Sequence, residues 1–197
     1  MHHNAEQIQV LNGLGIMKVK NTGEHFGLVT KLLHWAIAIS IIGLIWLGWY
    51  MVDLTYYDKW YNASLSWHKS LGMLVLAAAL LKIGWQVYSP VPDTTAALKA
   101  WEKMGANIMH KLLLLLMVLI PVTGYLISTS AGKVVDIFGW FEIPALVSKN
   151  KGLRDIAITL HFYMGYGIGF LVLGHVGAAL KHQFIDKDST LTKMLWK

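Results

Sequence analysis

The chain has 197 residues, of which 55% are hydrophobic and only 14% are charged. Soluble domains carry about 25% charged residues, so this composition indicates a membrane protein. The absence of cysteine excludes disulfides, thiolate metal sites, Cys-bound iron–sulfur clusters and covalently attached c-type haem. We attribute the net charge of +6 to lysines that flank membrane segments, since no basic, aromatic-rich patch indicates a nucleic-acid partner.

Residues 1–28 are polar and lack the leading apolar core of a cleaved signal peptide, so we expect a short N-terminal extension. Four apolar segments follow, each near or above the roughly 20 residues that cross a hydrocarbon core. These segments are Val29–Met51, Leu65–Val87, Ile108–Thr129 and Ile156–Lys181. The sequence therefore predicts an all-α fold, with one integral membrane four-helix bundle over residues 29–197.

Four spans place both termini on the same side of the membrane. Eleven of the 17 lysines and arginines fall on that side and six on the other, and basic residues accumulate in the cytoplasm. Four of the six outer basic residues crowd into the loop after the third span, which weakens the contrast without reversing it. Both termini, and with them the extension, are therefore expected in the cytoplasm.

Two loops are long enough to cover an end of the bundle. The inner loop Tyr88–Asn107 contains Pro90 and Pro92 and then a short Ala/Lys/Trp/Glu run that suits an amphipathic turn on the inner surface. The outer loop Ser130–Asp155 is the longest, and its segment Ile137–Leu146 is apolar and aromatic. We expect this segment to fold back onto the bundle and to cover what lies beneath it.

Two histidines on the last span, His161 and His175, are the most informative residues of the chain. They are fourteen residues apart, so a helix places them within roughly 40° of one face and about 21 Å apart along its axis. Because the spans alternate in direction, His34 lies at the inner depth of His175, and His68 lies at the outer depth of His161. Intramembrane histidines usually mark function, and facing helices of a bundle build cofactor sites.

Two stacked haem sites in the bundle core are therefore predicted, with His34/His175 and His68/His161 as the axial ligand pairs. Two imidazoles saturate a haem iron, and a six-coordinate iron passes electrons rather than binding a gas.

Other metal sites suit this pattern less well. A di-iron carboxylate bundle needs glutamates in its core, and the four spans contain no Asp or Glu. A zinc or copper site needs three or four ligands at one depth, whereas these histidines divide two and two. A proton-relay transporter is expected to use intramembrane acids. A haem-free structural or transport bundle, with the histidines satisfied in its core, stays open as an alternative.

Several short motifs stand in or beside the spans: Lys31–Trp35 (KLLHW), Trp67–Gly72 (WHKSLG), His110 with Ile120–Gly124 (IPVTG), Leu160–His175 (LHFYMGYGIGFLVLGH), Ala178–Phe184 (AALKHQF) and Asp186–Leu191 (DKDSTL). Together these motifs resemble the bacterial cytochrome b561 family of small dihaem membrane proteins. The resemblance covers about Gly27 to Trp196. It implies two haem b groups on the same four histidines, a place in the bacterial inner membrane, and quinone, with ubiquinone favoured, as the electron partner.

One branch of this family resembles superoxide oxidase, an oxidoreductase that takes an electron from superoxide at the periplasmic face and passes it to ubiquinone. This activity is the first expectation for the chain. Related dihaem subunits instead anchor a larger redox complex and relay electrons for a dehydrogenase or hydrogenase, and that role is the alternative.

Further polar residues near the spans are candidates for the same sites. His110 and His182 lie near the inner side and would bond a haem propionate or a quinone carbonyl, or would be ordinary interfacial histidines. Lys31, Lys69 and Lys111 adjoin span ends and would pair with propionates or extend to water.

Glycines near the predicted ligands would let a porphyrin approach the backbone, or would serve helix packing. They are Gly72, Gly165, Gly174 and Gly177. Pro121 predicts a kink in the third span.

Basic residues of the outer side would attract an anion such as superoxide, or would be solvated loop charges. They are Lys69, Lys133, Lys149, Lys151 and Arg154. We expect His2, His3 and His25, in the polar N-terminal part, to be solvated.

Overall fold

The computed structural model describes residues 18–195, apart from residues 24, 91, 93–97 and 189. Within this part of the chain, 4 helices are long and apolar enough to cross a membrane. They are α2 (Leu28–Val52), α3 (Tyr61–Tyr88), α4 (Ala100–Thr129) and α5 (Lys151–Lys181). At about 1.5 Å per residue, helices of 25 to 31 residues exceed the ~30 Å of a hydrocarbon core. The predicted four-helix membrane bundle is confirmed.

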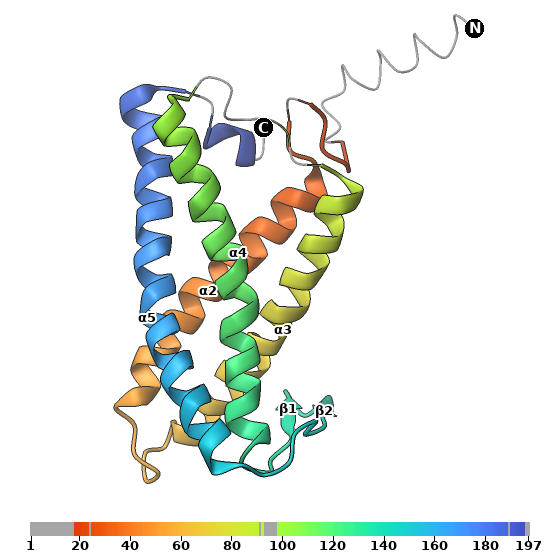
Figure 1. Ribbon diagram of the computed structural model, residues 1–197, viewed down its shortest axis with the longest axis vertical. Helices are drawn as coiled ribbons and strands as arrows, with labels where there is room; N and C mark the ends of the chain where they lie inside the picture. Colours follow the sequence, from red (N-terminus) through yellow and green to blue (C-terminus); the bar gives the residue numbers. More distant parts are fainter. Residues whose placement is uncertain (1–17, 24, 91, 93–97, 189, 196–197) are drawn as a thin grey trace, which may run out of the picture.

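The helices form an antiparallel bundle in which α2 packs against α3, α3 against α4 and α4 against α5 (Figure 1). The start of α2 and the end of α5 lie at one end, and the loop between α4 and α5 lies at the other (Figure 1). We call the end at which α2 begins the inner end and the opposite end the outer end.

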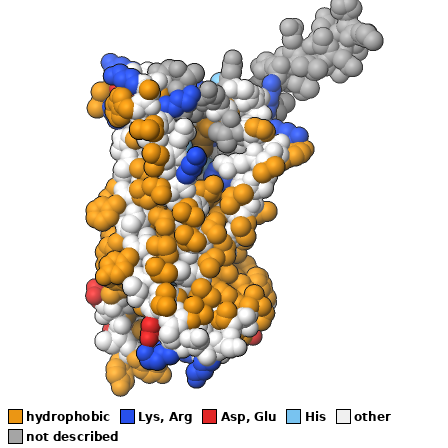
Figure 2. Space-filling model, in the orientation of Figure 1, with side chains coloured by type: hydrophobic (Ala, Val, Ile, Leu, Met, Phe, Trp, Pro, Cys, Tyr) orange, Lys and Arg blue, Asp and Glu red, His pale blue; other side chains and the backbone are white. Residues whose placement is uncertain are grey.

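The outward faces of the helices carry large apolar side chains. Ile39 and Phe170 are 66% and 76% exposed, although they lie in the middle parts of their helices. Figure 2 shows hydrophobic side chains over the middle of the molecule, with Lys and Arg gathered toward its ends. A helix that is apolar all round is stable only when another apolar phase covers it, which here is lipid.

The observed helices contain the predicted spans and extend beyond them, most clearly in α4. Ala100–Asn107, which the sequence predicted as an amphipathic turn of helix in the inner loop, is helical and is continuous with the third span as the first two turns of α4. Glu102 stabilises this start of the helix by accepting two hydrogen bonds. Its carboxylate accepts from the backbone N–H of Lys99 at 3.2 Å and from Nζ of Lys181 at 2.7 Å.

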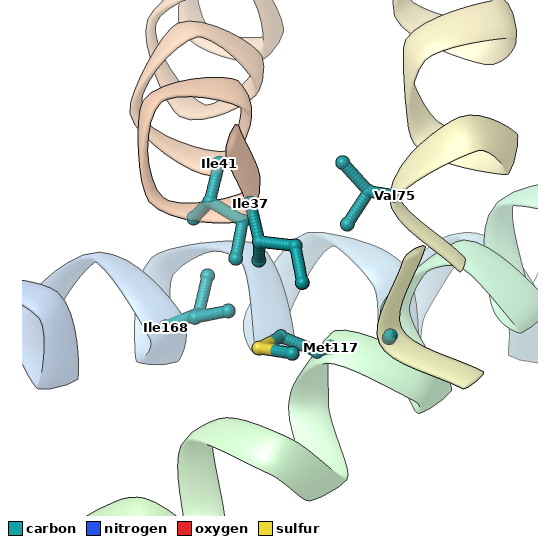
Figure 3. Close-up of a cluster of buried hydrophobic side chains, with 6 residues drawn as sticks. Ile37, Ile41, Val75, Met117 and Ile168 are labelled. Atoms are coloured by element: carbon teal, nitrogen blue, oxygen red, sulfur yellow. The ribbon is translucent and has the colours of Figure 1, made fainter. Parts of the chain in front are cut away.

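The apolar core lies midway between the two ends of the bundle. Ile37 and Ile41 of α2 meet Val75 of α3, Met117 of α4 and Ile168 of α5, and all five point toward one another (Figure 3). Ile168 is seven residues from His161 and seven from His175, which is about 10 Å of helix in each direction. The core therefore forms an apolar layer between an inner and an outer half.

The outer loop folds back onto the bundle, as expected, and contains a hairpin that the sequence did not predict. Strands β1 (Val135–Ile137) and β2 (Phe141–Ile143) pair in antiparallel fashion. The hydroxyl of Ser70 on α3 accepts from the backbone N–H of Phe138 at 3.1 Å and donates to the carbonyl of Asp136 at 3.2 Å. Ser70 is fully buried, so these two hydrogen bonds fix the hairpin to the bundle.

Two peripheral segments cover the inner end. Asn21, in the described part of the N-terminal extension, bonds to Ser89 at the end of α3. In the C-terminal tail, the short 3-10 helix Thr192–Met194 lies against α2. Nζ of Lys31 donates to the carbonyl of Leu195 at 2.7 Å, and Trp35 Nε1 donates to the carbonyl of Met194 at 3.0 Å.

Candidate cofactor sites

The bundle brings the four predicted histidines together as two pairs. The ring centroids of His34 and His175 are 6.3 Å apart, toward the inner end. Those of His68 and His161 are 6.0 Å apart, toward the outer end. These are the partnerships that helix direction and depth predicted, and ligation of a metal by them stays a prediction.

The ring separations fit one metal ion in each pair. Two imidazoles on opposite sides of a metal, with metal–nitrogen bonds of about 2 Å, have centroids roughly 6 Å apart. The ring of His110 lies closer to the ring of His175 than the ring of His34 does, with centroids 5.4 Å apart in an edge-on contact. His110 is therefore a neighbour of the inner pair, in direct ring contact with one of its members.

A cavity of about 350 Å³ adjoins the outer pair and has almost entirely apolar walls. Its lining includes His68 and His161, together with Gly72 and Gly165, the glycines that the sequence indicated one turn beyond them. An apolar cavity with two imidazoles in its wall matches a porphyrin, which is apolar over most of its surface.

Two further glycines, which sequence reasoning missed, stand directly against the outer rings. A Cβ atom at Gly48 of α2 would lie 3.4 Å from Cε1 of His68, and one at Gly124 of α4 would lie 3.1 Å from Cε1 of His161. Among the sequence-predicted glycines of α5, Gly174 faces Met109, and Gly177 has open space around it. Only the tertiary structure shows which glycines leave room for the ring planes.

Hydrogen bonds hold one ring of the outer pair, that of His161, in place. Nδ1 of His161 lies 2.9 Å from the carbonyl oxygen of Ile120 and 3.2 Å from the hydroxyl of Thr123. Because a carbonyl only accepts, Nδ1 carries the proton and leaves Nε2 free as a ligand. Nδ1 of His68 is buried and, among the described residues, has no hydrogen-bond partner. Such a buried nitrogen is unfavourable, which favours a bound group at this ring.

The inner pair has two further basic residues beside it, His110 of α4 and Lys82 of α3. Trp85 Nε1 of α3 donates to the hydroxyl of Thr30 on α2 at 3.0 Å. One turn deeper from this contact lie Lys82 on α3 and His34 on α2, and Lys82 interacts electrostatically with both His34 and His110. Lys82 is one of the eleven basic residues that the sequence assigns to the side of the termini, but sequence reasoning missed it as a site residue.

His182 occupies the single π-helical turn His182–Asp186 that follows α5. Its Nδ1 lies 2.7 Å from Oδ2 of Asp188 and 3.0 Å from Oδ2 of Asp186. Burial opposes ionisation of Asp188, but hydrogen bonds from Thr190 and His182 outweigh it and hold the pKa of Asp188 below its usual value. His182 is thus engaged by acids at the inner surface, and its predicted contact to a propionate or quinone stays a prediction.

The remaining predicted residues are placed as follows. Lys69 is half-buried, lines the outer cavity and lies within electrostatic range of Lys133. Lys111 and His25 are exposed, and His2 and His3 lie outside the described residues.

A membrane four-helix bundle with two stacked pairs of facing imidazoles has the architecture of a membrane cytochrome of the b type. Residues 25–197 match the family described as prokaryotic cytochrome b561, and the chain belongs to this family, which binds haem b. It is therefore a multi-pass protein of the inner membrane that takes part in electron transfer.

Curated relatives agree with this assignment. The chain is 39% identical over 181 residues to cytochrome b561 homolog 2 of Escherichia coli (strain K12), covering 92% of this chain and 96% of the relative. It is 27% identical over 174 residues to cytochrome b561 homolog 1 of the same organism, covering 83% and 92%. It is 25% identical over 171 residues to the probable superoxide oxidase CybB of Yersinia pestis, covering 84% and 92%.

Proposed function

We propose that the protein passes single electrons from a periplasmic donor to membrane quinone through two haem b groups. His34 and His175 would hold the inner haem, and His68 and His161 would hold the outer one. The observation that carries this proposal is the presence of two facing imidazole pairs, at 6.3 Å and 6.0 Å, in one bundle. When bound, each haem supplies a one-electron couple at a saturated iron.

The residues of the chain orient and insulate these sites. The Ile120 carbonyl and the Thr123 hydroxyl hold the ring of His161 in one tautomer. Met117 and Ile168, in the layer between the two pairs, exclude water from the middle of the bundle. The protein in this way sets ligation and burial, and the electron chemistry belongs to the cofactor.

Superoxide is the first specific donor we propose, and ubiquinone is the acceptor. Two superoxide anions would each lose one electron and leave as dioxygen, and these two electrons with two protons would reduce one quinone to quinol. The name of the Yersinia pestis relative supports this choice. So does Lys69, a cation in the wall of the outer cavity.

The second candidate is an anchor subunit that relays electrons for a bound dehydrogenase or hydrogenase. The outer hairpin favours this role because Trp140 and Phe141 are 75% and 55% exposed beyond the membrane spans. Large exposed aromatic side chains are typical of protein contacts. A stoichiometric partner that co-purifies in mild detergent would favour this candidate over the first.

We further propose that both termini are cytoplasmic, with residues 1–28 as a cytoplasmic extension of the bundle formed by residues 29–197. The eleven basic residues on the side of the termini, against six on the other, support this orientation.

A redox difference spectrum and the pyridine haemochrome of the purified protein test the core of the proposal. We expect two haem b per chain, and we expect His161→Ala and His175→Ala each to retain one. A colourless protein, or loss of both haems in each variant, would show that the two pairs are not separate sites. Haem reduction on mixing with superoxide, followed by reduction of added ubiquinone, tests the donor and the acceptor.

A further inference from the structure

The inner site contains one basic residue from each helix of the bundle. His34 comes from α2, Lys82 from α3, His110 from α4 and His175 from α5. The contact between Trp85 and Thr30 holds α3 against α2, so that Lys82 faces His34 one turn deeper in the bundle.

Lys82 is a half-buried cation inside a membrane span. It lies six residues before the end of α3, about 9 Å from the inner end of the helix. Ionisable residues at such positions face the bundle interior and are paired. Among the residues that the structure describes, no carboxylate forms an ion pair with Lys82.

Three acids of the inner end that the structure describes are engaged elsewhere. Glu102 and Asp186 both accept from Nζ of Lys181 at 2.7 Å. Asp188 lies against His182. Lys82 therefore lies within electrostatic range of two histidine rings, His34 and His110, and no acid in the described part of the chain balances its charge.

We propose that Lys82 is the charge partner of the inner haem, where its ammonium group pairs with a haem carboxylate and raises the midpoint potential of that site. This inference rests on the proposed function, since it takes His34 and His175 as the ligands of that haem. A b-type haem carries two carboxylate side chains, which are the counter-ions that an unpaired buried cation requires. A nearby positive charge also stabilises the reduced form, which holds one more electron.

Lys82 acts here as a positioning and tuning residue, and the sign of its effect follows from charge alone. Removing the cation should lower the inner potential and leave the outer potential unchanged, because the apolar layer of Ile37, Val75 and Met117 separates the two halves. Across about 10 Å of bundle interior, one charge should change the ratio of reduced to oxidised haem about tenfold. For a one-electron couple this equals about 59 mV.

The test is a redox titration of the haem-loaded protein, in which the wild type shows two waves. His161→Ala removes the outer site, and the wave that remains belongs to the inner site. In Lys82→Met we expect two haems per chain. The midpoint potential of the inner wave should fall, so that the ratio of reduced to oxidised inner haem drops about tenfold at a given potential. The outer wave should not move. Lys82→Arg keeps the charge and should restore the inner wave.

Two controls make the result specific. Lys187→Met removes an exposed inner-end cation and should leave both waves in place, and Lys69→Met, at the outer cavity, should leave the inner wave in place. An unmoved inner wave in Lys82→Met with both haems retained overturns the inference, as does an equal shift of both waves.

If Lys82→Met folds poorly, Lys82→Gln and Lys82→Arg replace it, and an arginine variant that behaves like the glutamine variant also overturns the inference. A wild type with fewer than two haems per chain would instead overturn the proposed function itself.

Discussion

At the residue scale, ring position in the outer pair depends on the absence of side chains opposite it. Gly124 stands where a Cβ would approach His161 to 3.1 Å, which is closer than about nine in ten Cβ contacts in proteins. The ring has little freedom to withdraw, because its Nδ1 is held by the Ile120 carbonyl. A larger residue at position 124 must therefore displace the ring of His161 or the helix.

We predict that Gly124→Val lowers the content of outer haem at least several-fold and leaves the inner haem in place. The branched side chain adds volume against a ring in a packed interior, and overpacking of this kind moves side chains off their positions. Pyridine haemochrome and the two redox waves report the loss. Gly105→Val is the matched control on α4, because a Cβ there meets open space. Equal haem loss in both variants would contradict the argument.

At the scale of elements, the ends of the bundle are closed by short segments that polar groups hold in place. Ser70 fixes the outer hairpin through two hydrogen bonds, and its side chain is fully buried. At the inner end, Asp188 bonds to Thr190 and His182 and anchors the C-terminal tail.

Ser70→Ala should lower the free energy of unfolding by about 1–3 kcal/mol, because it leaves the backbone N–H of Phe138 and the carbonyl of Asp136 without their shared partner. Thermal unfolding of the purified protein in detergent measures this change. Ser148→Ala in the same outer loop is an exposed control and should be neutral. An unchanged transition in Ser70→Ala would show that the hairpin is held by other contacts.

Asp188→Asn should destabilise the protein only where the wild-type carboxyl is ionised. The folded-state pKa of Asp188 is below its unfolded value of about 3.9, so its contribution is fully present above about pH 4 and is lost as the pH falls through the folded pKa. Unfolding temperatures of the two proteins should therefore differ at pH 6 and converge toward pH 3. Asp53→Asn, at the exposed end of α2, serves as the control for loss of one charge. A difference that does not shrink as the pH falls below 4 would exclude ionisation as its cause.

At the scale of the whole molecule, the distribution of charge sets the electrostatic potential at each end of the bundle. Lys and Arg gather toward both ends of the molecule (Figure 2). At the outer end, Lys69 lines the outer cavity and Lys133 lies within electrostatic range of Lys69. Positive potential at that mouth would concentrate an anion.

We predict that the rate of haem reduction by superoxide falls as ionic strength rises. Salt shortens the Debye length from about 30 Å at 0.01 M to about 8 Å at 0.15 M and so screens the attraction. Stopped-flow measurements over this range test the effect, and Lys69→Gln combined with Lys133→Gln should flatten the dependence. A rate independent of salt in the wild type would reject steering by these lysines.

The sequence alone determined the four spans, the antiparallel order and the pairing of histidines by depth. These features follow from hydrophobic length and from the fixed rise and turn of a helix, which are local properties. His161 and His175 could be assigned to one face of one helix without any knowledge of their neighbours.

Only the tertiary structure decided what surrounds the two pairs. The contacts of Gly48 and Gly124 with the rings and the approach of Lys82 to His34 join residues far apart in the chain. The outer hairpin and the early start of α4 likewise depend on partners in other elements, Ser70 and Lys181. Helical periodicity fixes which face a residue occupies, but the packing of one helix on another fixes what that face meets.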